Sequence, residues 1–248
     1  MNKKIKSLLL ATATVGLLAG CGGEEESKKL TMITSADYPP FEYIDTAGGG
    51  EYKGIDVEIA QAITEKLGYE LEIKDMDFAG LVQSLQSKQA DFSMAAMTAD
   101  EERKKSVDFS DVYYMANHAV ISLEGSGIDS EEDLAGLKVG AQLGTIQEDK
   151  VLELQDSVGL TAENRNKVPE LIQELKSNRL DAIVVEDTVA EGYLKTNDDL
   201  QSFTIEDSEG GYAIAFPKDS ELTDEFNKVL KEMLEDGTID TIVKKYFE

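Results

Sequence analysis

An eleven-residue segment occurs twice in this chain of 248 residues. Residues 81–91 (LVQSLQSKQAD) match residues 171–181 (LIQELKSNRLD), with two leucines, a glutamine, a serine and the last aspartate in register. Each copy predicts an amphipathic helix that runs into an apolar strand. Two such copies far apart predict two lobes of similar α/β construction, since a solenoid would need more repeats. The alternative is a chance likeness between two amphipathic helices.

The rest of the chain alternates between strand and helix patterns. Strands are predicted at 30–34, 69–73, 91–97, 118–123, 138–142 and 181–185, and helices at 55–67, 78–88, 147–154, 169–178 and, as two helices broken near Gly237, 222–247. This alternation is typical of a largely parallel α/β sheet. Ligands of such sheets bind beyond the carboxyl ends of the strands, so the residues from 95 and from 186 onward are predicted to face a ligand.

The N-terminus has the pattern of an export signal. Basic residues in 1–6 precede an apolar run, 7–20, that is too short to span a bilayer comfortably. Residues 18–21 (LAGC) resemble the lipobox of bacterial lipoproteins, in which the cysteine receives a diacylglycerol and becomes the first mature residue. We therefore predict a signal peptide at 1–20, lipidation of Cys21 and a flexible spacer at 21–29; the alternative is a buried free cysteine.

The charge balance excludes several classes of partner. The chain has 24 Lys+Arg against 50 Asp+Glu, a formal net charge of −26. Such a charge disfavours nucleic acid and repels anionic lipid heads, so a membrane link would be the covalent lipid. Cys21 is the only cysteine, and neither a zinc-binding cluster nor the spacing of a calcium-binding loop occurs. We expect no metal and no cofactor.

The loops after the two repeated strands carry opposite charges. Thr98 and Glu101 have the spacing of a capping box, which predicts a helix start close to Arg103. A helix N-terminus beside a guanidinium favours a carboxylate. The second loop offers Glu186 and Asp187 instead. A ligand that bridges the loops would be a zwitterion such as a free amino acid, its carboxylate on Arg103 and its ammonium on Glu186.

A second helix start points to the same cleft. Thr145 and Glu148 repeat the capping pattern after the strand at 138–142. Exposed ion pairs contribute only about 0–1 kcal/mol, whereas hydrogen bonds to charged groups shielded from water contribute roughly 1.5–3 kcal/mol each. We therefore expect the lobes to close over the ligand. The ordinary alternative is that Thr98 is only a helix cap and residues 103–105 are a solvated charged face.

Several sequence blocks occur in the order of a known family. They lie at 37–43 (DYPPFEY), 54–57, 76–78, 97–98 with 102–105, 107–110 and 142–145. They resemble the polar amino-acid solute-binding proteins of ABC importers, the bacterial extracellular solute-binding proteins of family 3. The resemblance implies an α/β, two-lobed fold of the type II periplasmic binding proteins. Lobe 1 would comprise 30–116 and 209–248 and lobe 2 would comprise 117–208, with a ligand cleft between them and two hinge strands near 114–118 and 209–212.

The resemblance also implies roles for individual residues. Arg103 and Thr98 would hold the ligand carboxylate, Ala96 would offer a backbone group, and Thr145 would assist from the other lobe. Glu186 would take the ammonium.

Two more positions are expected ligand contacts, and three others are secondary candidates. Tyr38 and Phe78 match aromatic positions that pack on the ligand, although both could be core aromatics. Ser35 stands where several relatives have an aspartate. Gln142 and Asp187 are secondary candidates, and Asp187 leaves the choice of ammonium partner open.

The expected ligand is a free polar amino acid. An acidic one would need a second cation near these motifs, and the negative charge steers cations toward the cleft, so arginine or lysine is favoured, with glutamine next. We expect an extracytoplasmic lipoprotein on the outer face of the cytoplasmic membrane that delivers this ligand to a permease. The alternatives are a lyase resembling cyclohexadienyl dehydratase or a sensory ligand-binding module. Against an enzyme, His118 is the only histidine and no Gly-x-Ser-x-Gly motif occurs.

Overall fold

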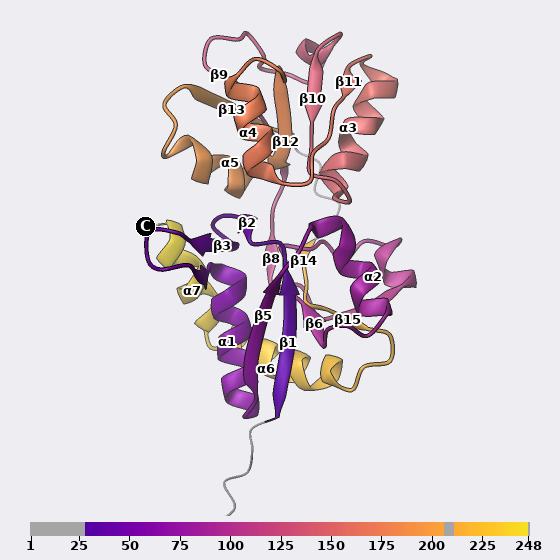
Figure 1. Ribbon diagram of the computed structural model, residues 1–248, viewed down its shortest axis with the longest axis vertical. Helices are drawn as coiled ribbons and strands as arrows, with labels where there is room; N and C mark the ends of the chain where they lie inside the picture. Colours follow the sequence, from indigo (N-terminus) through magenta and orange to yellow (C-terminus); the bar gives the residue numbers. More distant parts are fainter. Residues whose placement is uncertain (1–27, 206–210, 248) are drawn as a thin grey trace, which may run out of the picture.

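Two lobes, each built on a five-stranded sheet, stand one above the other in the computed structural model, which describes residues 28–205 and 211–247 (Figure 1). The α/β, two-lobed prediction is confirmed. The predicted signal peptide at 1–20, Cys21 and most of the predicted spacer lie outside the described residues. None of the helices in the described ranges combines the length and apolar character needed to cross a bilayer.

The lower lobe in Figure 1 contains both ends of the described chain. Its main sheet has the strand order β5-β1-β6-β15-β7. The strands are β1 (Lys29–Thr34), β5 (Glu70–Asp75), β6 (Phe92–Ser93), β7 (Val107–Phe109) and β15 (Ala215–Pro217). The helices are α1 (Ile55–Leu67), α2 (Leu81–Gln86), α6 (Leu222–Glu235) and α7 (Thr238–Phe247), with the short 3₁₀ helices η1 (Phe78–Gly80) and η2 (Arg103–Lys105). A small antiparallel sheet comprises β2 (Asp37–Tyr38), β3 (Glu42–Asp45) and β4 (Glu51–Lys53).

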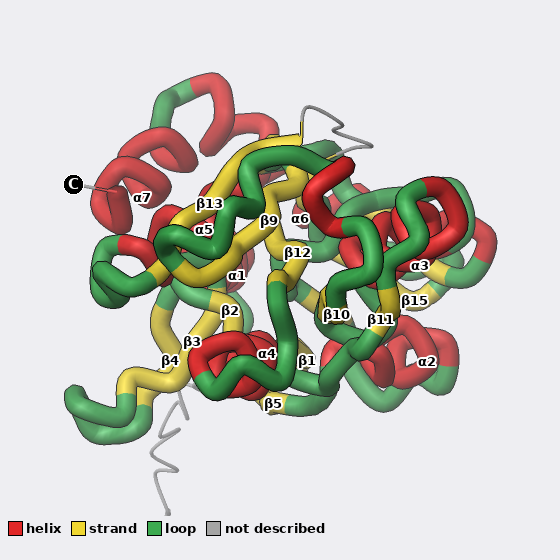
Figure 2. Tube along the Cα trace, turned by 90° about the horizontal axis from the view of Figure 1, so that it is seen from above, coloured by secondary structure: helices red, strands yellow, loops and turns green. Residues whose placement is uncertain are grey.

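The upper lobe has the strand order β11-β10-β12-β9-β13. Its strands are β9 (His118–Leu123), β10 (Lys138–Gly140), β11 (Thr161–Ala162), β12 (Ala182–Glu186) and β13 (Leu200–Ile205). Its helices are α3 (Ile146–Ser157), α4 (Val168–Lys176) and α5 (Asp187–Leu194), with the 3₁₀ helix η3 (Glu132–Leu134). Seen from above, α3 and α4 lie on opposite sides of the row of strands (Figure 2). Accordingly β12 buries both faces: Ala182 and Val184 share a core with α3, while Ile183 and Val185 share one with α4.

In each five-stranded sheet four strands run in one direction, as the prediction of a largely parallel sheet requires, and one strand is reversed. In the lower lobe β15 is antiparallel to β6 and β7, and in the upper lobe β9 is antiparallel to β12 and β13. Both strands follow the antiparallel pair formed by β8 (Tyr114–Met115) and β14 (Gly211–Tyr212), which lies between the lobes (Figure 1). They enter their sheets from the cleft side, so they run against the strands whose carboxyl ends face the cleft.

The repeated segment forms the same turn in both lobes. The backbone N–H of Asp91 donates to the carbonyl of Thr31 (2.9 Å), and its carboxylate accepts from the Thr31 N–H (2.7 Å). Asp181 makes both contacts with Lys138, each at 2.8 Å. In each copy the residue three before the aspartate has a positive φ, 53° and 55°. The matching sequences therefore encode matching helix-to-strand connections.

The predicted helices are present, and one predicted strand is shorter. α1 ends at Gly68, whose φ of 76° supplies the left-handed cap, and α6 and α7 separate at Gly237. The strand expected at 91–97 ends at Ser93, because the chain turns into the cleft and Ala96 adopts a φ of 47°. The exact lobe boundaries stay a prediction, and the second, at 208/209, lies outside the described residues.

Candidate functional site

A cavity between the lobes, called here the interlobe cavity, has walls from both sheets. It is lined by Tyr38, Glu42, Phe78, Ala95, Ala96, Thr98 and Arg103 of the lower lobe and by Gln142, Thr145, Ile146, Gln147 and Glu186 of the upper lobe. The structure thus brings together Gln142 and all seven residues predicted as primary ligand contacts. Two secondary candidates, Ser35 and Asp187, are not on its wall.

The guanidinium of Arg103 joins the two lobes. Nη1 donates to the carbonyl of Thr98 (2.9 Å), and Nη2 donates across the cleft to the carbonyl of Gly144 (2.9 Å). Nε lies 3.2 Å from a carboxylate oxygen of Asp100, and the guanidinium carbon lies 5.4 Å from the centre of the Phe78 ring. These contacts occupy three of the five N–H donors of an arginine. The other two donors have no protein partner among the contacts of the described residues and are left for a carboxylate.

The capping box predicted at Thr98 and Glu101 is wrong. Thr98 is extended and forms an isolated bridge with Tyr212 of β14. The helix near Arg103 is only the three-residue η2, and its turn is held by Asp100, which accepts the Arg103 N–H at 2.7 Å. Pairing with the hinge strand keeps Thr98 out of a helix. The carboxylate donors on this side therefore come from the guanidinium and not from a helix N-terminus.

Thr145 caps a helix, as predicted. Its hydroxyl accepts from the N–H of Glu148 (3.2 Å) and donates to the carbonyl of Gln142 (2.7 Å). The Glu148 carboxylate reaches back to the N–H of Gly144 (2.6 Å). The first contact satisfies a free donor of the first turn of α3, and together the three contacts fix the N-terminus of α3 on the cavity wall.

Ala96 can offer a ligand its carbonyl oxygen. Its N–H is taken, because it donates to the carboxylate of Asp56 at 2.8 Å. A carbonyl is an acceptor, so it suits an ammonium group and not a carboxylate. The backbone contact predicted for Ala96 is thus restricted to the cationic end of a ligand.

Glu186 stands at the end of β12 with one oxygen unpaired. Its side chain is buried; Oε1 accepts from the side-chain amide of Gln147 (2.8 Å), and Oε2 has no hydrogen-bond partner among the described residues. Burial raises the pKa of Glu186 to about 8, against the opposing effects of its own backbone N–H and of the nearby Tyr212 hydroxyl. Asp187 is committed elsewhere: its carboxylate accepts from the backbone and side chain of Asn117. Between the two acids, only Glu186 faces the cavity.

Glu42 is the acid that sequence reasoning missed. It lies in β3, is 1% exposed, and its Oε2 finds no partner in the described part of the chain. Burial, together with the charges of Asp56 and Asp37, raises the pKa of Glu42 well above its usual range. An acid inside the aromatic block at 38–43 is the only sequence signal that marks it. The other cavity residues that were missed are Ala95, Ile146 and Gln147.

Ser35 and Gln142 belong to a contact between the lobes beside the cavity. The Ser35 hydroxyl donates to the carboxylate of Asp37 (2.7 Å), and the Gln142 amide donates to the carbonyl of Asn166 (3.0 Å). Asp37 also accepts the N–H of Val168 from the upper lobe (3.0 Å). Ser35 therefore acts here through Asp37.

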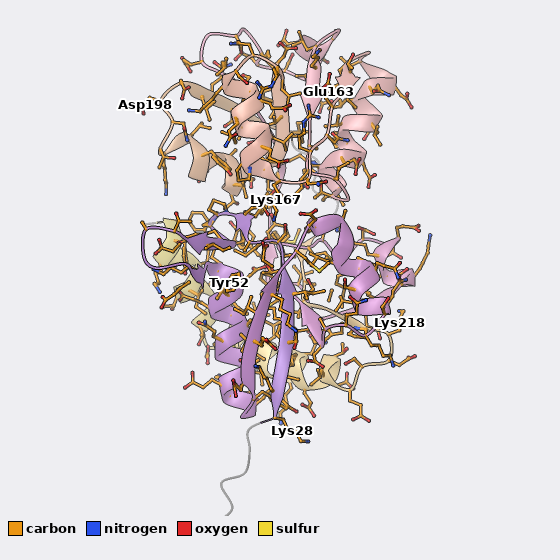
Figure 3. All side chains as sticks on the ribbon, viewed as in Figure 1. Lys28, Tyr52, Glu163, Lys167, Asp198 and Lys218 are labelled. Atoms are coloured by element: carbon orange, nitrogen blue, oxygen red, sulfur yellow. The ribbon has the colours of Figure 1, made fainter. Side chains whose placement is uncertain are left out.

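Lys167 adds charge to the same contact. Figure 3 shows it at the level where the lobes meet. Its ammonium lies 3.6–3.9 Å from carboxylate oxygens of Asp37, Asp75 and Asp77, all of the lower lobe. With the Arg103 contact on Gly144, these interactions hold the two lobes together at more than one edge of the cavity.

Comparison with known proteins decides the family. A family model described as bacterial extracellular solute-binding proteins, family 3, matches residues 30–248. The chain belongs to this family. The predicted family is thereby confirmed, and an extracytoplasmic location follows for the family 3 protein.

Similar proteins span nearly the whole chain. This family 3 protein is 52% identical over 253 residues to the arginine-binding extracellular protein ArtP of Bacillus subtilis (strain 168), covering 99% of this chain and 98% of that one. It is similar in structure to an ancestral arginine-binding protein bound to arginine (TM-score 0.84, 42% identity, covering 89% and 98% of the two chains). The same holds for an ancestral arginine-binding protein bound to glutamine (TM-score 0.83, 42% identity, covering 88% and 97%). All three are named as binding proteins.

Proposed function

We propose that this family 3 protein captures L-arginine outside the cytoplasm and delivers it to an ABC importer. The observation that carries the proposal is the charge pattern of the interlobe cavity. Among the described residues that line it, Arg103 is the only cation, and two buried acids, Glu42 and Glu186, each have an oxygen without a partner. L-Arginine has one carboxylate and two cationic groups, which is the complementary set. Buried charges need such pairing because desolvation is costly.

Each group of the ligand has a place in the cavity. The carboxylate takes the two remaining donors of Arg103, and the ammonium binds Glu186 Oε2 and the carbonyl of Ala96. The guanidinium then pairs with Glu42. Tyr38 presents an aromatic ring to the same space, which favours a planar guanidinium over the ammonium of lysine.

A neutral side chain fits this pattern less well. With glutamine in the cavity, Glu42 would be left without a cation. A buried unsatisfied polar group costs about 1–3 kcal/mol, which corresponds to roughly 5- to 150-fold in affinity. The names of the arginine-binding relatives support the same choice.

The proposal includes a lipid anchor at Cys21 and a permease as partner. Lys28, the first described residue, lies at the end of the lower lobe far from the upper lobe (Figure 3). A tether attached there leaves the cleft side of both lobes free to face a permease. A lipid and a short spacer also raise the effective concentration of the protein at the membrane surface.

Calorimetry on the purified protein, unfolded and refolded to remove bound ligand, tests the proposal against the set of L-amino acids. We expect L-arginine to bind most tightly, with lysine and glutamine at least tenfold weaker. Binding of glutamine or lysine ahead of arginine would overturn the ligand assignment. Binding of no amino acid would overturn the proposed function itself.

A further inference from the structure

Two neighbouring carboxyl groups, those of Asp56 and Glu42, lie at the interlobe cavity, and neither forms an ion pair with a cation among the described residues. Asp56 is fully buried in α1, and its two oxygens accept the N–H of Ala96 (2.8 Å) and the hydroxyl of Tyr113 (2.7 Å). Glu42 lies beside it on β3 and contributes to the cavity wall, with Oε2 unpartnered within the described residues. Asp56 is therefore committed to the fold, whereas Glu42 has an oxygen left for whatever enters the cavity.

The surroundings of Glu42 are acidic or phenolic. The titratable groups around it are Asp37 and Tyr38 of β2, Asp56 of α1, Tyr113 of the segment before β8 and Tyr212 of β14. Tyr38, Arg103 and Glu186 also share the cavity wall. The guanidinium of Arg103 is directed to Thr98, Gly144 and Asp100, as described above.

These neighbours decide the charge of the pair. Burial raises the pKa of Asp56 to about 6, against the hydrogen bonds from Ala96, Tyr113 and Glu42. Burial and the charges of Asp56 and Asp37 raise the pKa of Glu42 well above its usual range. Two adjacent buried carboxyls cannot both ionise cheaply. Asp56 has two donors to stabilise its negative charge, so the proton of the pair belongs on Glu42 when no cation is present.

We propose that Glu42 either forms an ion pair with a cationic group of the ligand or takes up a proton. The complex with a neutral amino acid then holds one more proton than the complex with arginine. The inference rests on the proposed function, which assigns the ligand's guanidinium to Glu42. In the arginine complex Glu42 is a carboxylate paired with the guanidinium. In the complex with a neutral amino acid, the carboxyl group of Glu42 carries a proton taken from solvent. Glu42 thereby makes the preference between cationic and neutral ligands depend on pH.

Linkage gives the sign and the size of the effect. The ratio of the two dissociation constants depends only on the difference in bound protons between the two complexes, because the free protein cancels. The contact of the ligand ammonium with Glu186 and that of the ligand carboxylate with Arg103 are common to both complexes, so their contributions also cancel in the ratio. Between the pKa values of Glu42 in the two complexes, each pH unit upward should therefore favour the cationic ligand by up to tenfold.

L-Arginine and L-citrulline form a matched pair of probes. Citrulline has nearly the same shape and carries a neutral ureido group in place of the guanidinium. Calorimetry with wild-type protein from pH 5 to pH 9 should show the ratio of the citrulline to the arginine dissociation constant rising with pH. Titrations in buffers of different ionisation enthalpy should give proton uptakes that differ by about one between the two ligands.

Two variants test whether Glu42 is the group that takes up the proton. Glu42→Gln should give a small ratio that is flat with pH, because the amide carries no titrating group. Glu70→Gln, which changes an exposed glutamate of β5, should keep the wild-type profile. Since the buffer measurement uses wild-type protein, it stands even if Glu42→Gln does not fold.

The outcomes separate this inference from the function on which it rests. A ratio that does not change with pH, while arginine still binds, overturns the proton exchange and leaves the proposed function intact. A wild-type slope that persists in Glu42→Gln also overturns the exchange, because another group then holds the proton. Failure of arginine to bind at all overturns both.

Discussion

At the scale of single residues, substitution of Arg103 is the most direct test of how the ligand carboxylate is bound. It uses three donors on the protein and keeps two for the cavity. Hydrogen bonds between charged groups contribute about 1.5–3 kcal/mol each. We expect Arg103→Ala to weaken arginine binding at least 100-fold, measured by calorimetry, with the far-UV circular dichroism spectrum unchanged.

Arg165→Ala is the matched control. Its guanidinium pairs with Glu163 and Glu174 on the upper lobe and does not line the interlobe cavity. It removes the same charge without removing a ligand contact, so affinity should stay within about threefold of wild type. Comparable losses in both variants would mean that the net charge of the protein, and not a direct contact, accounts for the effect.

Residues that follow the ends of strands could be predicted from the sequence, and a residue buried by elements distant in the chain could not. Thr98, Thr145 and Glu186 were found because parallel strands deliver their next residues to one edge of the sheet. Glu42 was missed because strand alternation does not say whether a face is solvated or buried by elements that are distant in the chain. Its burial depends on α1 and on the hinge, which the local pattern does not contain.

At the scale of elements, the start of α1 depends on a glycine. Gly54 has a φ of 129°, and a Cβ added there would lie 2.0 Å from the carbonyl oxygen of Phe41. The contact is with backbone and cannot be relieved by a rotamer change. We expect Gly54→Ala to lower the free energy of unfolding by at least about 3 kcal/mol, measured by urea denaturation, because steric overlap adds to the strain of the backbone conformation.

Gly49→Ala isolates the conformational part of that cost. Gly49 has a φ of 111°, and an added Cβ would meet no atom within 4 Å. Only strain and the change in chain entropy remain, so a loss of roughly 1–2 kcal/mol is expected. If the two alanine variants lose the same stability, the approach to Phe41 is not what requires a glycine at Gly54.

Elements fixed by their own periodicity were predicted well. α1, α6 and α7 show apolar residues at helical spacing; α1 stops at Gly68, and Gly237 separates α6 from α7. The strand expected at 91–97 and the helix start expected at Thr98 were wrong, because this stretch bends into the cleft and then pairs with β14, more than 100 residues away in the chain. Long-range pairing overrode the local signal.

At the scale of the whole molecule, the repeat predicted the number of lobes and their common helix-to-strand unit but not how the lobes meet. The contacts that join them link positions far apart in sequence, such as the Asp37 carboxylate with the Val168 N–H and the Arg103 guanidinium with the Gly144 carbonyl. No local pattern encodes such pairs. They describe a closed arrangement of the lobes, and ligand binding is expected to stabilise it.

Gly144 provides a test of closure. Its φ is 80°, and a Cβ added there would lie 2.8 Å from the Cα of Ala79, on the opposite lobe. Alanine at this position would therefore obstruct the closed form while leaving room in an open one. We expect Gly144→Ala to weaken arginine binding about tenfold or more, and small-angle X-ray scattering should show a smaller decrease in the radius of gyration on adding arginine than wild type shows.

The matched control must share the strained backbone of Gly144 but not its neighbour. Gly159 lies in the same lobe with a φ of 86°, and an added Cβ would meet nothing within 4 Å. Both alanine variants should lose a similar amount of stability, about 1–3 kcal/mol, because left-handed backbone disfavours a Cβ in each. Only Gly144→Ala should lose affinity and compaction, since only its methyl group meets the other lobe. Equal affinity in the two variants would mean that the ligand is held without the close approach of Gly144 to Ala79.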